Sequence, residues 1–202
     1  MNILLFGGTF DPVHYGHISL LQSAIDAVNP DKALIIPAAL PPHKAAASAK
    51  KELRLEMCEA ILPYIHGTAP EIEQCELVRQ GSSFTIDTIN ELNNKYPNSR
   101  FYFCLGSDML LYFKKWRSYK ELLQKLVLVV QMRTGADIAK AIDMSQSLVR
   151  EGGNIIFTHT QPIVVSSTFV RESIANGDDI TELVPLQIIK IINNNNLYAK
   201  EV

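Results

Sequence analysis

Two histidines, His14 and His17, stand three positions apart in the segment GGTFDPVHYGH, which spans residues 7–17. At this spacing they would share one face of the first turn of a helix. Two imidazoles on one face can donate hydrogen bonds to phosphate oxygens. They can also stabilise the charge that grows when a phosphoryl or nucleotidyl group is transferred. The alternative interpretation is a pair of capping or core histidines at a helix start.

The glycines of this segment are expected to bring the backbone close to a ligand. Gly7 and Gly8 would let the chain turn sharply after a strand and approach a phosphate. Gly16, between the two histidines, would leave room for a nucleobase or a ribose. The helix that begins here would also offer N–H groups and the positive end of its dipole, which favour phosphate.

A second candidate for phosphate binding is the segment Ser166-Ser167-Thr168 together with Arg171. Ser167 or Thr168 is a natural N-cap for a helix. Arg171 would then lie one turn further on the same side. Hydroxyls, N–H groups and a guanidinium would converge there, which suits a terminal phosphate. The alternative is a capped helix with an exposed arginine.

Two loops add possible anion-binding groups. Lys44 follows two prolines that stiffen the loop, and its ammonium is a point charge for phosphate, although a solvated lysine is the commoner case. Residues 81–85 form a polar helix start that ends in Thr85. This start could be an anion clamp or a simple N-cap.

Gly106, Asp108 and Trp116 follow a predicted strand and could hold a nucleoside. A carboxylate at the end of a strand can accept hydrogen bonds from ribose hydroxyls. Trp116, the single tryptophan, could stack on a flat cationic ring or pack in the core.

Several other kinds of site lack support. Neither G-x-G-x-x-G nor G-x-x-x-x-G-K-[ST] occurs after the first strand, so a dinucleotide site and a P-loop lose their main evidence. A zinc site on His14 and His17 would need a third ligand, and the other histidines lie in separate segments, so metal binding ranks low. Cys58, Cys75 and Cys104 form no C-x-x-C pair, and we expect reduced thiols.

The composition predicts a globular chain that does not coat nucleic acid. The 202 residues carry 19 Lys+Arg and 21 Asp+Glu, a formal net charge of -2, whereas proteins that coat a nucleic-acid polymer are usually basic. No apolar run approaches the roughly 18 residues of a membrane helix. The apolar start Ile3–Phe6 is too short for a signal peptide core. We expect one soluble, cytoplasmic domain in residues 1–202.

Short apolar runs alternate with helical periods, which predicts an α/β fold: a doubly wound, Rossmann-like parallel sheet with helices on both faces. The predicted strands are Ile3–Phe6, Ala33–Pro37, Ile72–Val78, Phe101–Leu105, Val127–Gln131 and Asn154–Phe157. The predicted helices are His17–Asn29, Lys51–Leu62, one opening at Thr85, Met109–Phe113, Tyr119–Lys125, Ala136–Arg150, Thr168–Asn176 and Pro185–Asn193. Ligands of such sheets bind beyond the carboxyl ends of the strands, where the strand order reverses. We therefore expect the candidate segments to meet there, with a helical C-terminal part over about residues 166–202.

In this order, the segments resemble the nucleotidyltransferase superfamily marked by H-x-G-H and a late S-S-T-x-x-R, and within it the bacterial nicotinate mononucleotide adenylyltransferases. The resemblance covers nearly the whole chain, through GGTFDPVHYGH (7–17), PPHK (41–44), ELVRQGSSFTIDTI (76–89), FYFCLGSDMLLYFKKW (101–116), VSSTFVRESI (165–174) and LY (197–198). It implies transfer of AMP from ATP to nicotinate mononucleotide by direct in-line attack without a covalent intermediate. Deamido-NAD and pyrophosphate would be the products, and Mg²⁺ would accompany ATP.

The resemblance also implies roles for individual residues. The catalytic residues would be His14, His17, Lys44 and Arg171. ATP would be bound by Gly7, Gly8, Thr9, Phe10, Gly106, Arg133, Ser166, Ser167 and Thr168, and nicotinate mononucleotide by Thr85, Asp108 and Trp116. The chain departs from the family at residues 133–135, which read Arg-Thr-Gly where Arg-Pro-Gly is usual, on the adenosine side.

Other functions stay open at this point. A related adenylyltransferase could use nicotinamide mononucleotide or phosphopantetheine, although chains of the latter kind tend to carry Thr at the position of His14. A cytidylyltransferase would lack the context of Trp116. A non-catalytic nucleotide sensor would favour a degraded H-x-G-H or a missing Arg171, and both are intact. A zinc hydrolase lacks its third ligand, and the sequence does not fix an oligomeric state.

Overall fold

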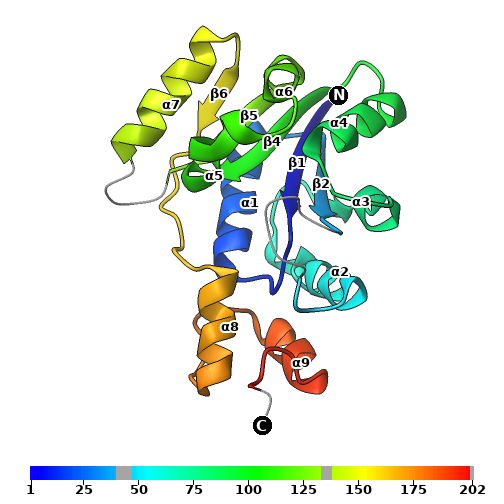
Figure 1. Ribbon diagram of the computed structural model, residues 1–202, viewed down its shortest axis with the longest axis vertical. Helices are drawn as coiled ribbons and strands as arrows, with labels where there is room; N and C mark the ends of the chain where they lie inside the picture. Colours follow the sequence, from blue (N-terminus) through cyan, green and yellow to red (C-terminus); the bar gives the residue numbers. More distant parts are fainter. Residues whose placement is uncertain (40–46, 133–137, 201–202) are drawn as a thin grey trace.

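A computed structural model describes residues 1–39, 47–132 and 138–200 (Figure 1). Within these residues, six parallel strands form one sheet in the order β3-β2-β1-β4-β5-β6. The strands are β1 (Asn2–Gly8), β2 (Lys32–Pro37), β3 (Pro70–Ile72), β4 (Arg100–Gly106), β5 (Leu126–Gln131) and β6 (Asn154–Phe157). The strand order reverses between β1 and β4, which is the switch point of a doubly wound sheet. The predicted fold class is confirmed.

Helices cover both faces of the sheet. They are α1 (Tyr15–Val28), α2 (Lys51–Ala60), α3 (Cys75–Val78), α4 (Thr85–Lys95), α5 (Ser107–Tyr112), α6 (Tyr119–Lys125), α7 (Ile138–Arg150), α8 (Ser167–Asn176) and α9 (Leu186–Asn194), with short 3-10 turns η1 (Leu62–Tyr64) and η2 (Phe113–Lys115). Alternate residues of β1 serve the two layers. Leu4 and Phe6 pack with α1, α2 and α9, whereas Ile3 and Leu5 pack with α4 to α7. Because both faces are covered, the strands read as continuous apolar runs, which is why the runs predicted them.

The predicted strand Ile72–Val78 is wrong after its first residue. β3 ends at Ile72, and the residues from Cys75 form the single helical turn α3. The carboxylate of Glu73 accepts the N–H of Cys75 at 3.2 Å, and Glu76 turns inward to accept the hydroxyl of Thr88. These two side-chain contacts favour a turn over an extended strand, and an apolar pattern does not reveal them.

Other predicted elements are confirmed with small shifts at their ends. The helix α1 begins at Tyr15, two residues before the predicted start, and α6 has the predicted bounds. The helix predicted from Lys51 ends at Ala60 and continues as η1, while Ala136 lies outside the described residues. α8 ends at Asn176, and Gly177 after it adopts φ 79°, as a glycine after a helix is expected to do.

The C-terminal helices lie beyond the carboxyl edge of the sheet. Figure 1 shows α8 and α9 below the ends of the strands, away from the N-terminus. The backbone N–H of Tyr15, at the start of α1, donates to the carbonyl of Leu183 at 3.0 Å, which ties this region to the first helix. Among the described helices, none has the length and apolar character that crossing a bilayer would require.

Candidate active site

The segment between β1 and α1 follows the carboxyl end of the central strand. A Cβ on Gly8 would lie 2.8 Å from two ring atoms of Phe10, so close packing requires glycine there. The left-handed backbone falls on Phe10, with φ 53°, and its ring is 1% exposed. The glycine is therefore required by the buried ring, a reason that the expectation of a sharp turn at Gly7 and Gly8 did not include.

The two histidines cap α1 and stack on each other. His14 is the N-cap, and its Nδ1 accepts the backbone N–H of His17 at 3.3 Å, while Nδ1 of His17 accepts the N–H of His14 at 3.3 Å. Their ring centroids are 3.7 Å apart. Because each Nδ1 is an acceptor, a neutral ring carries its proton on Nε2 and is a donor there. The two histidines therefore cap the helix, and their rings also lie on the same face of its first turn.

Two expectations about the start of α1 are wrong. The N–H of Tyr15 is taken by Leu183, and the N–H of His17 is taken by His14, so this terminus does not offer a row of open donors. A Cβ on Gly16 would lie 2.9 Å from the carbonyl oxygen of Ile163. The space beside Gly16 is filled by the protein's own backbone, which explains the glycine without a nucleobase.

The segment before α8 contacts the first loop directly. Ser166, rather than Ser167 or Thr168, is the N-cap, and its Oγ accepts the N–H of Phe169 at 3.1 Å. The hydroxyl of Ser167 donates to the carbonyl of Pro12 at 2.9 Å. In the part of the chain that the structure describes, the N–H groups of Ser167 and Thr168 have no acceptor. These N–H groups are suited to bind phosphate, whereas the hydroxyl of Ser167 joins the helix to the loop.

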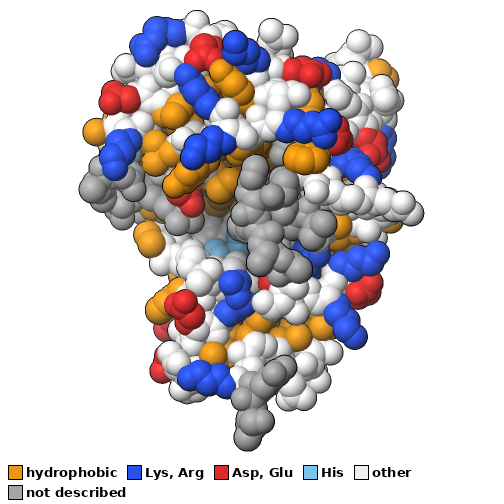
Figure 2. Space-filling model, viewed as in Figure 1, with side chains coloured by type: hydrophobic (Ala, Val, Ile, Leu, Met, Phe, Trp, Pro, Cys, Tyr) orange, Lys and Arg blue, Asp and Glu red, His pale blue; other side chains and the backbone are white. Residues whose placement is uncertain are grey.

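Arg171 is oriented by the same loop. Its Nη1 donates to the carbonyl of Asp11 at 2.7 Å, and its Nη2 donates to Thr168 Oγ1 at 3.3 Å. The two candidate phosphate segments, 160 positions apart, therefore meet at one place. Figure 2 shows a hollow between the part that holds the sheet and the part that holds α8 and α9, with histidine atoms inside it.

Asp11 lies at the centre of this region and is 5% exposed. Its carboxylate accepts the N–H groups of Ser48 and Ala49, at 2.7 and 3.0 Å, and the hydroxyl of Tyr198 at 2.7 Å. Three donors from two distant segments thus satisfy one buried carboxylate.

Arg54, from α2, supports the same loop from beneath and is only 2% exposed. Its Nη1 donates to the carbonyls of Thr9 and Ala38 at 2.7 and 2.6 Å. Burial lowers the pKa of this guanidinium, and the nearby carboxylate of Asp11 opposes that shift. We call Asp11, Arg54, Arg171 and Tyr198 the phosphate-end network.

Thr85 opens α4 as predicted, but neither it nor Ser83 is an N-cap. The N-cap is Phe84, which makes no capping bond through its side chain. Ser83 Oγ instead accepts the N–H of Ala39 at 3.1 Å, just after β2. The polar start of α4 is thereby joined to the carboxyl edge of the sheet.

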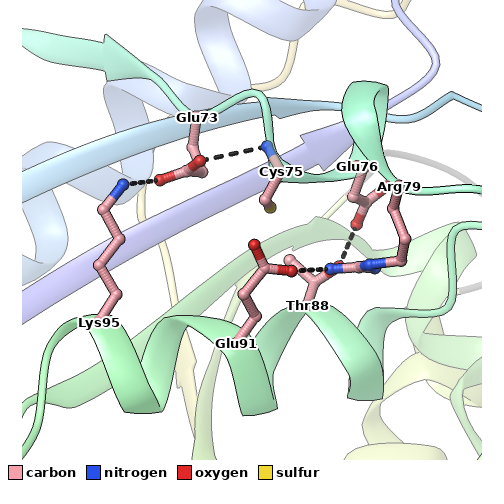
Figure 3. Close-up of polar contacts among 7 residues, drawn as sticks. All are labelled: Glu73, Cys75, Glu76, Arg79, Thr88, Glu91 and Lys95. Carbon is pink, nitrogen blue, oxygen red and sulfur yellow. Dashed lines mark hydrogen bonds and ion pairs between the residues drawn. The ribbon is translucent and has the colours of Figure 1, made fainter.

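Behind this helix start lies a set of five charged side chains and one threonine that link the α3 region to α4 (Figure 3). We call it the α3–α4 network, and its members are Glu73, Glu76, Arg79, Thr88, Glu91 and Lys95. Glu76 is 8% exposed and accepts the hydroxyl of Thr88 at 2.7 Å. Burial raises the pKa of Glu76, against hydrogen bonds from Thr88 and Ser83 that favour its ionised form. Arg79 donates to Thr88 and to Glu91.

Gly106, Asp108 and Trp116 follow β4, beside the end of β1. Gly106 is the last residue of β4 and the N-cap of α5, and Asp108 is half-buried in the first turn of that helix. Trp116 is half-buried, and its ring centroid lies 5.1 Å from that of Phe113 and 5.7 Å from that of Phe103. Trp116 therefore packs against two core phenylalanines, and part of its surface stays exposed.

Lys44 and Arg133 lie outside the described residues, as do the prolines before Lys44 and the departure at residues 133–135. Among the residues that are described, no group of three or more His, Cys, Asp or Glu side chains could hold a metal ion. The three cysteines are unpaired and buried, and burial raises the pKa of the Cys75 thiol to about 12.

The chain matches known proteins over nearly its whole length. Residues 5–173 match the family model described as Cytidylyltransferase-like. A Shewanella woodyi protein named "Probable nicotinate-nucleotide adenylyltransferase" is 34% identical over 98% of this chain and 99% of its own. A Shouchella clausii protein of the same name is 35% identical over 96% of this chain and 95% of its own. The chain belongs to the cytidylyltransferase-like family, among its nicotinate-nucleotide adenylyltransferases.

A solved structure has the same fold as this adenylyltransferase family member. The Plasmodium falciparum nicotinic acid mononucleotide adenylyltransferase, complexed with NaAD, aligns with a TM-score of 0.82 at 20% identity over 98% of this chain and 97% of its own. At that identity the likeness concerns the fold alone. It agrees with the strand order found here.

Three residues of the phosphate-end network, Asp11, Arg54 and Tyr198, carry no sequence signal that predicts their role. Asp11 and Tyr198 lay within recognised segments, but nothing in their spacing indicates that they touch. Arg54 lay in a predicted helix, and a charged residue there is expected to face solvent. Only the fold brings these residues together.

Proposed function

We propose that the protein transfers AMP from ATP to nicotinate mononucleotide and releases pyrophosphate and deamido-NAD, in NAD biosynthesis. Membership of the adenylyltransferase family supports this reaction. The structural observation that carries it is the 2.7 Å bond from Arg171 to the carbonyl of Asp11. It brings the late phosphate-binding segment beside the loop that presents His14 and His17.

In the proposed reaction, a phosphate oxygen of the mononucleotide attacks the α-phosphorus of ATP in line. A bond forms between that oxygen and the phosphorus, and the bond to the bridging oxygen breaks. Pyrophosphate leaves with the electron pair. Such a transfer needs positioning and charge stabilisation rather than a protein nucleophile. His14, His17 and Lys44 would stabilise the growing charge, and Arg171 with the N–H groups of α8 would hold the leaving phosphates.

The substrates are assigned to two sides of the site. ATP would lie along Gly7 to Phe10, Gly106, Arg133 and residues 166–168, and the mononucleotide against Thr85, Asp108 and Trp116. The contact of Ser83 with Ala39 supports the second assignment because it holds the start of α4 at the edge of the sheet. The half-buried Trp116 ring is suited to stack on a pyridine ring.

Mg²⁺ would enter with ATP, and it would neutralise phosphate charge there. Membership of a family whose named members are adenylyltransferases supports a divalent metal ion with ATP. We further propose that residues 1–202 act as one cytoplasmic domain, with residues 166–202 as its C-terminal helical part. The bond from Tyr15 to Leu183 supports this single unit.

The deciding experiment measures pyrophosphate release from ATP and Mg²⁺ with three acceptors in parallel. We expect release to be fastest with nicotinate mononucleotide. Comparable rates with nicotinamide mononucleotide would show that the protein does not prefer the acid over the amide. Release only with phosphopantetheine would show that phosphopantetheine, not a pyridine mononucleotide, is the acceptor. Silence with all three would contradict adenylyl transfer and favour a nucleotide sensor.

The role of His17 can be separated from its role as a cap. His17→Ala should lower kcat by about 100-fold or more. The KM should rise far less. His17→Gln keeps an acceptor for the N–H of His14, as in a capping box, but has no imidazole. It should lose kcat while it keeps the stability of the wild type. His66→Ala removes an exposed histidine elsewhere and should be fully active. Near-normal kcat in His17→Gln would contradict the proposed role.

A further inference from the structure

Tyr198 reaches back 187 positions to the first loop of the protein. Its hydroxyl donates to Asp11 Oδ1 at 2.7 Å. Its backbone adopts the left-handed conformation, with φ 65°, which turns the chain after α9 toward the site. Burial, together with the bond to Asp11, raises the pKa of this tyrosine above its ordinary value. The hydroxyl therefore stays protonated at neutral pH and remains a donor.

The partner of Tyr198 is the residue that also orients Arg171. The backbone carbonyl of Asp11 accepts Arg171 Nη1, and its carboxylate accepts the N–H groups of Ser48 and Ala49. The bond from Tyr198 thus restrains Asp11, whose backbone contacts Arg171 and whose side chain contacts the segment before α2. An open cavity of about 330 Å³ lies beside the two residues, and the side chains of Arg171 and Tyr198 both line it.

We propose that Tyr198 is a positioning residue for adenylyl transfer, because its hydroxyl holds Asp11 in the position that directs the guanidinium of Arg171 toward the phosphates of ATP. This inference rests on the proposed function. Tyr198 acts through Asp11 and Arg171 and does not itself take part in the chemistry.

A purely structural role for the same bond predicts a different outcome. The C-terminal region is already held by buried side chains of α9, among them Ile188, Ile191 and Ile192, and by the bond from Tyr15 to Leu183. Loss of one hydroxyl should therefore lower Tm by no more than a few degrees. A displaced guanidinium, in contrast, can cost far more in rate, since a shift of about 1 Å can reduce turnover about 100-fold.

The test is Tyr198→Phe, which keeps the ring and removes the hydroxyl. We expect kcat/KM for ATP to fall at least about tenfold. The KM for the mononucleotide should change less than twofold, and Tm by no more than a few degrees. The matched control is Tyr119→Phe, which also removes a phenol bond to a carboxylate, that of Glu151 at 3.1 Å, in a region remote from Arg171. The control should keep wild-type kinetics.

A double variant shows whether Tyr198 acts through Arg171. If it does, Tyr198→Phe added to Arg171→Ala should cause almost no further loss of kcat/KM. Full additivity of the two losses, or wild-type kinetics in Tyr198→Phe, would overturn the inference and leave adenylyl transfer standing.

A binding measurement distinguishes this inference from the function itself. We expect calorimetric titration with ATP to show weaker binding to Tyr198→Phe than to the wild type and to Tyr119→Phe. If the wild type releases no pyrophosphate with any acceptor, the proposed function fails, and the titration still tests the positioning of Arg171. Equal ATP affinity in all three proteins would then contradict it.

Discussion

The phosphate-end network and the α3–α4 network hold the two sides of the candidate site together by different means. In the first, the contacts to Asp11 join residues 37 to 187 positions apart, and Arg54 reaches Ala38 and Thr9, which lie 16 and 45 positions away. Their partners are buried charges and backbone carbonyls. In the second, the contacts join residues 9 to 22 positions apart, mostly between side chains with partial exposure (Figure 3). One side depends on the complete fold, and the other depends on a local unit of two helices and a strand.

This difference should be visible in the stability of two arginine variants. Arg54→Ala leaves the carbonyls of Thr9 and Ala38 without their donor inside the protein, so we expect a loss of about 3–5 kcal/mol. Arg79→Ala removes a partly exposed ion pair with Glu91 and should cost about 1 kcal/mol or less. Urea unfolding at 25 °C measures both. Similar losses in the two variants would contradict the distinction between the networks.

The second comparison concerns the substrate that each side of the candidate site is proposed to bind. Ser83→Ala removes the acceptor for the N–H of Ala39 and loosens the start of α4. We expect the KM for the mononucleotide to rise about fivefold, with the KM for ATP unchanged, because one hydrogen bond contributes about 1 kcal/mol. Steady-state kinetics with each substrate varied in turn measures both constants.

Ser145→Ala is the matched control for Ser83→Ala. It removes a buried serine hydroxyl that donates to Ile142 at 2.7 Å within α7, and should leave both constants unchanged. A rise in the KM for ATP in Ser83→Ala would show that the two sides are not separate.

The smallest expected effect is the pH dependence that Glu76 contributes to stability. Its pKa is raised in the folded protein, so the folded state binds the proton more tightly than the unfolded chain. This contribution is present at low pH and is lost as the pH rises above the ordinary value of 4.5. In Glu76→Gln it is absent. The stability of this variant relative to the wild type should therefore increase as the pH rises from about 4.5.

Glu151→Gln should give the opposite slope and is the control. A bond from Lys114 lowers the pKa of Glu151, so its contribution is present above the ordinary carboxyl value and is lost as the pH falls. Urea unfolding between about pH 4.5 and 7 measures both slopes, and slopes of the same sign would contradict the assignment for Glu76.

The fold could be predicted from the sequence to a large extent because burial on both faces leaves continuous apolar runs. Five of the six strands were predicted as apolar runs, and four of these five are largely buried, while β6 is only partly buried. The predicted strand at 72–78 fails after Ile72 because Glu76 is buried by a hydroxyl partner rather than by apolar character. The positions of His14, His17 and Arg171 on helix starts were predicted from their spacing. The contacts around them were not, since Leu183 binds the N–H of Tyr15 and Ile163 lies against Gly16, both from distant segments. The carbonyl of Asp11 likewise accepts Arg171 from far away in the sequence.

Long-range contacts at Asp11 also set an order of assembly. The strands are complete once Phe157 has been made, whereas Asp11 still lacks the guanidinium of Arg171 and the hydroxyl of Tyr198. During synthesis from the N-terminus, the sheet can form first and the phosphate end can close only last. A nascent chain that stops after β6 would therefore contain the sheet and the histidine pair, and it would lack the groups that we propose hold the leaving phosphates.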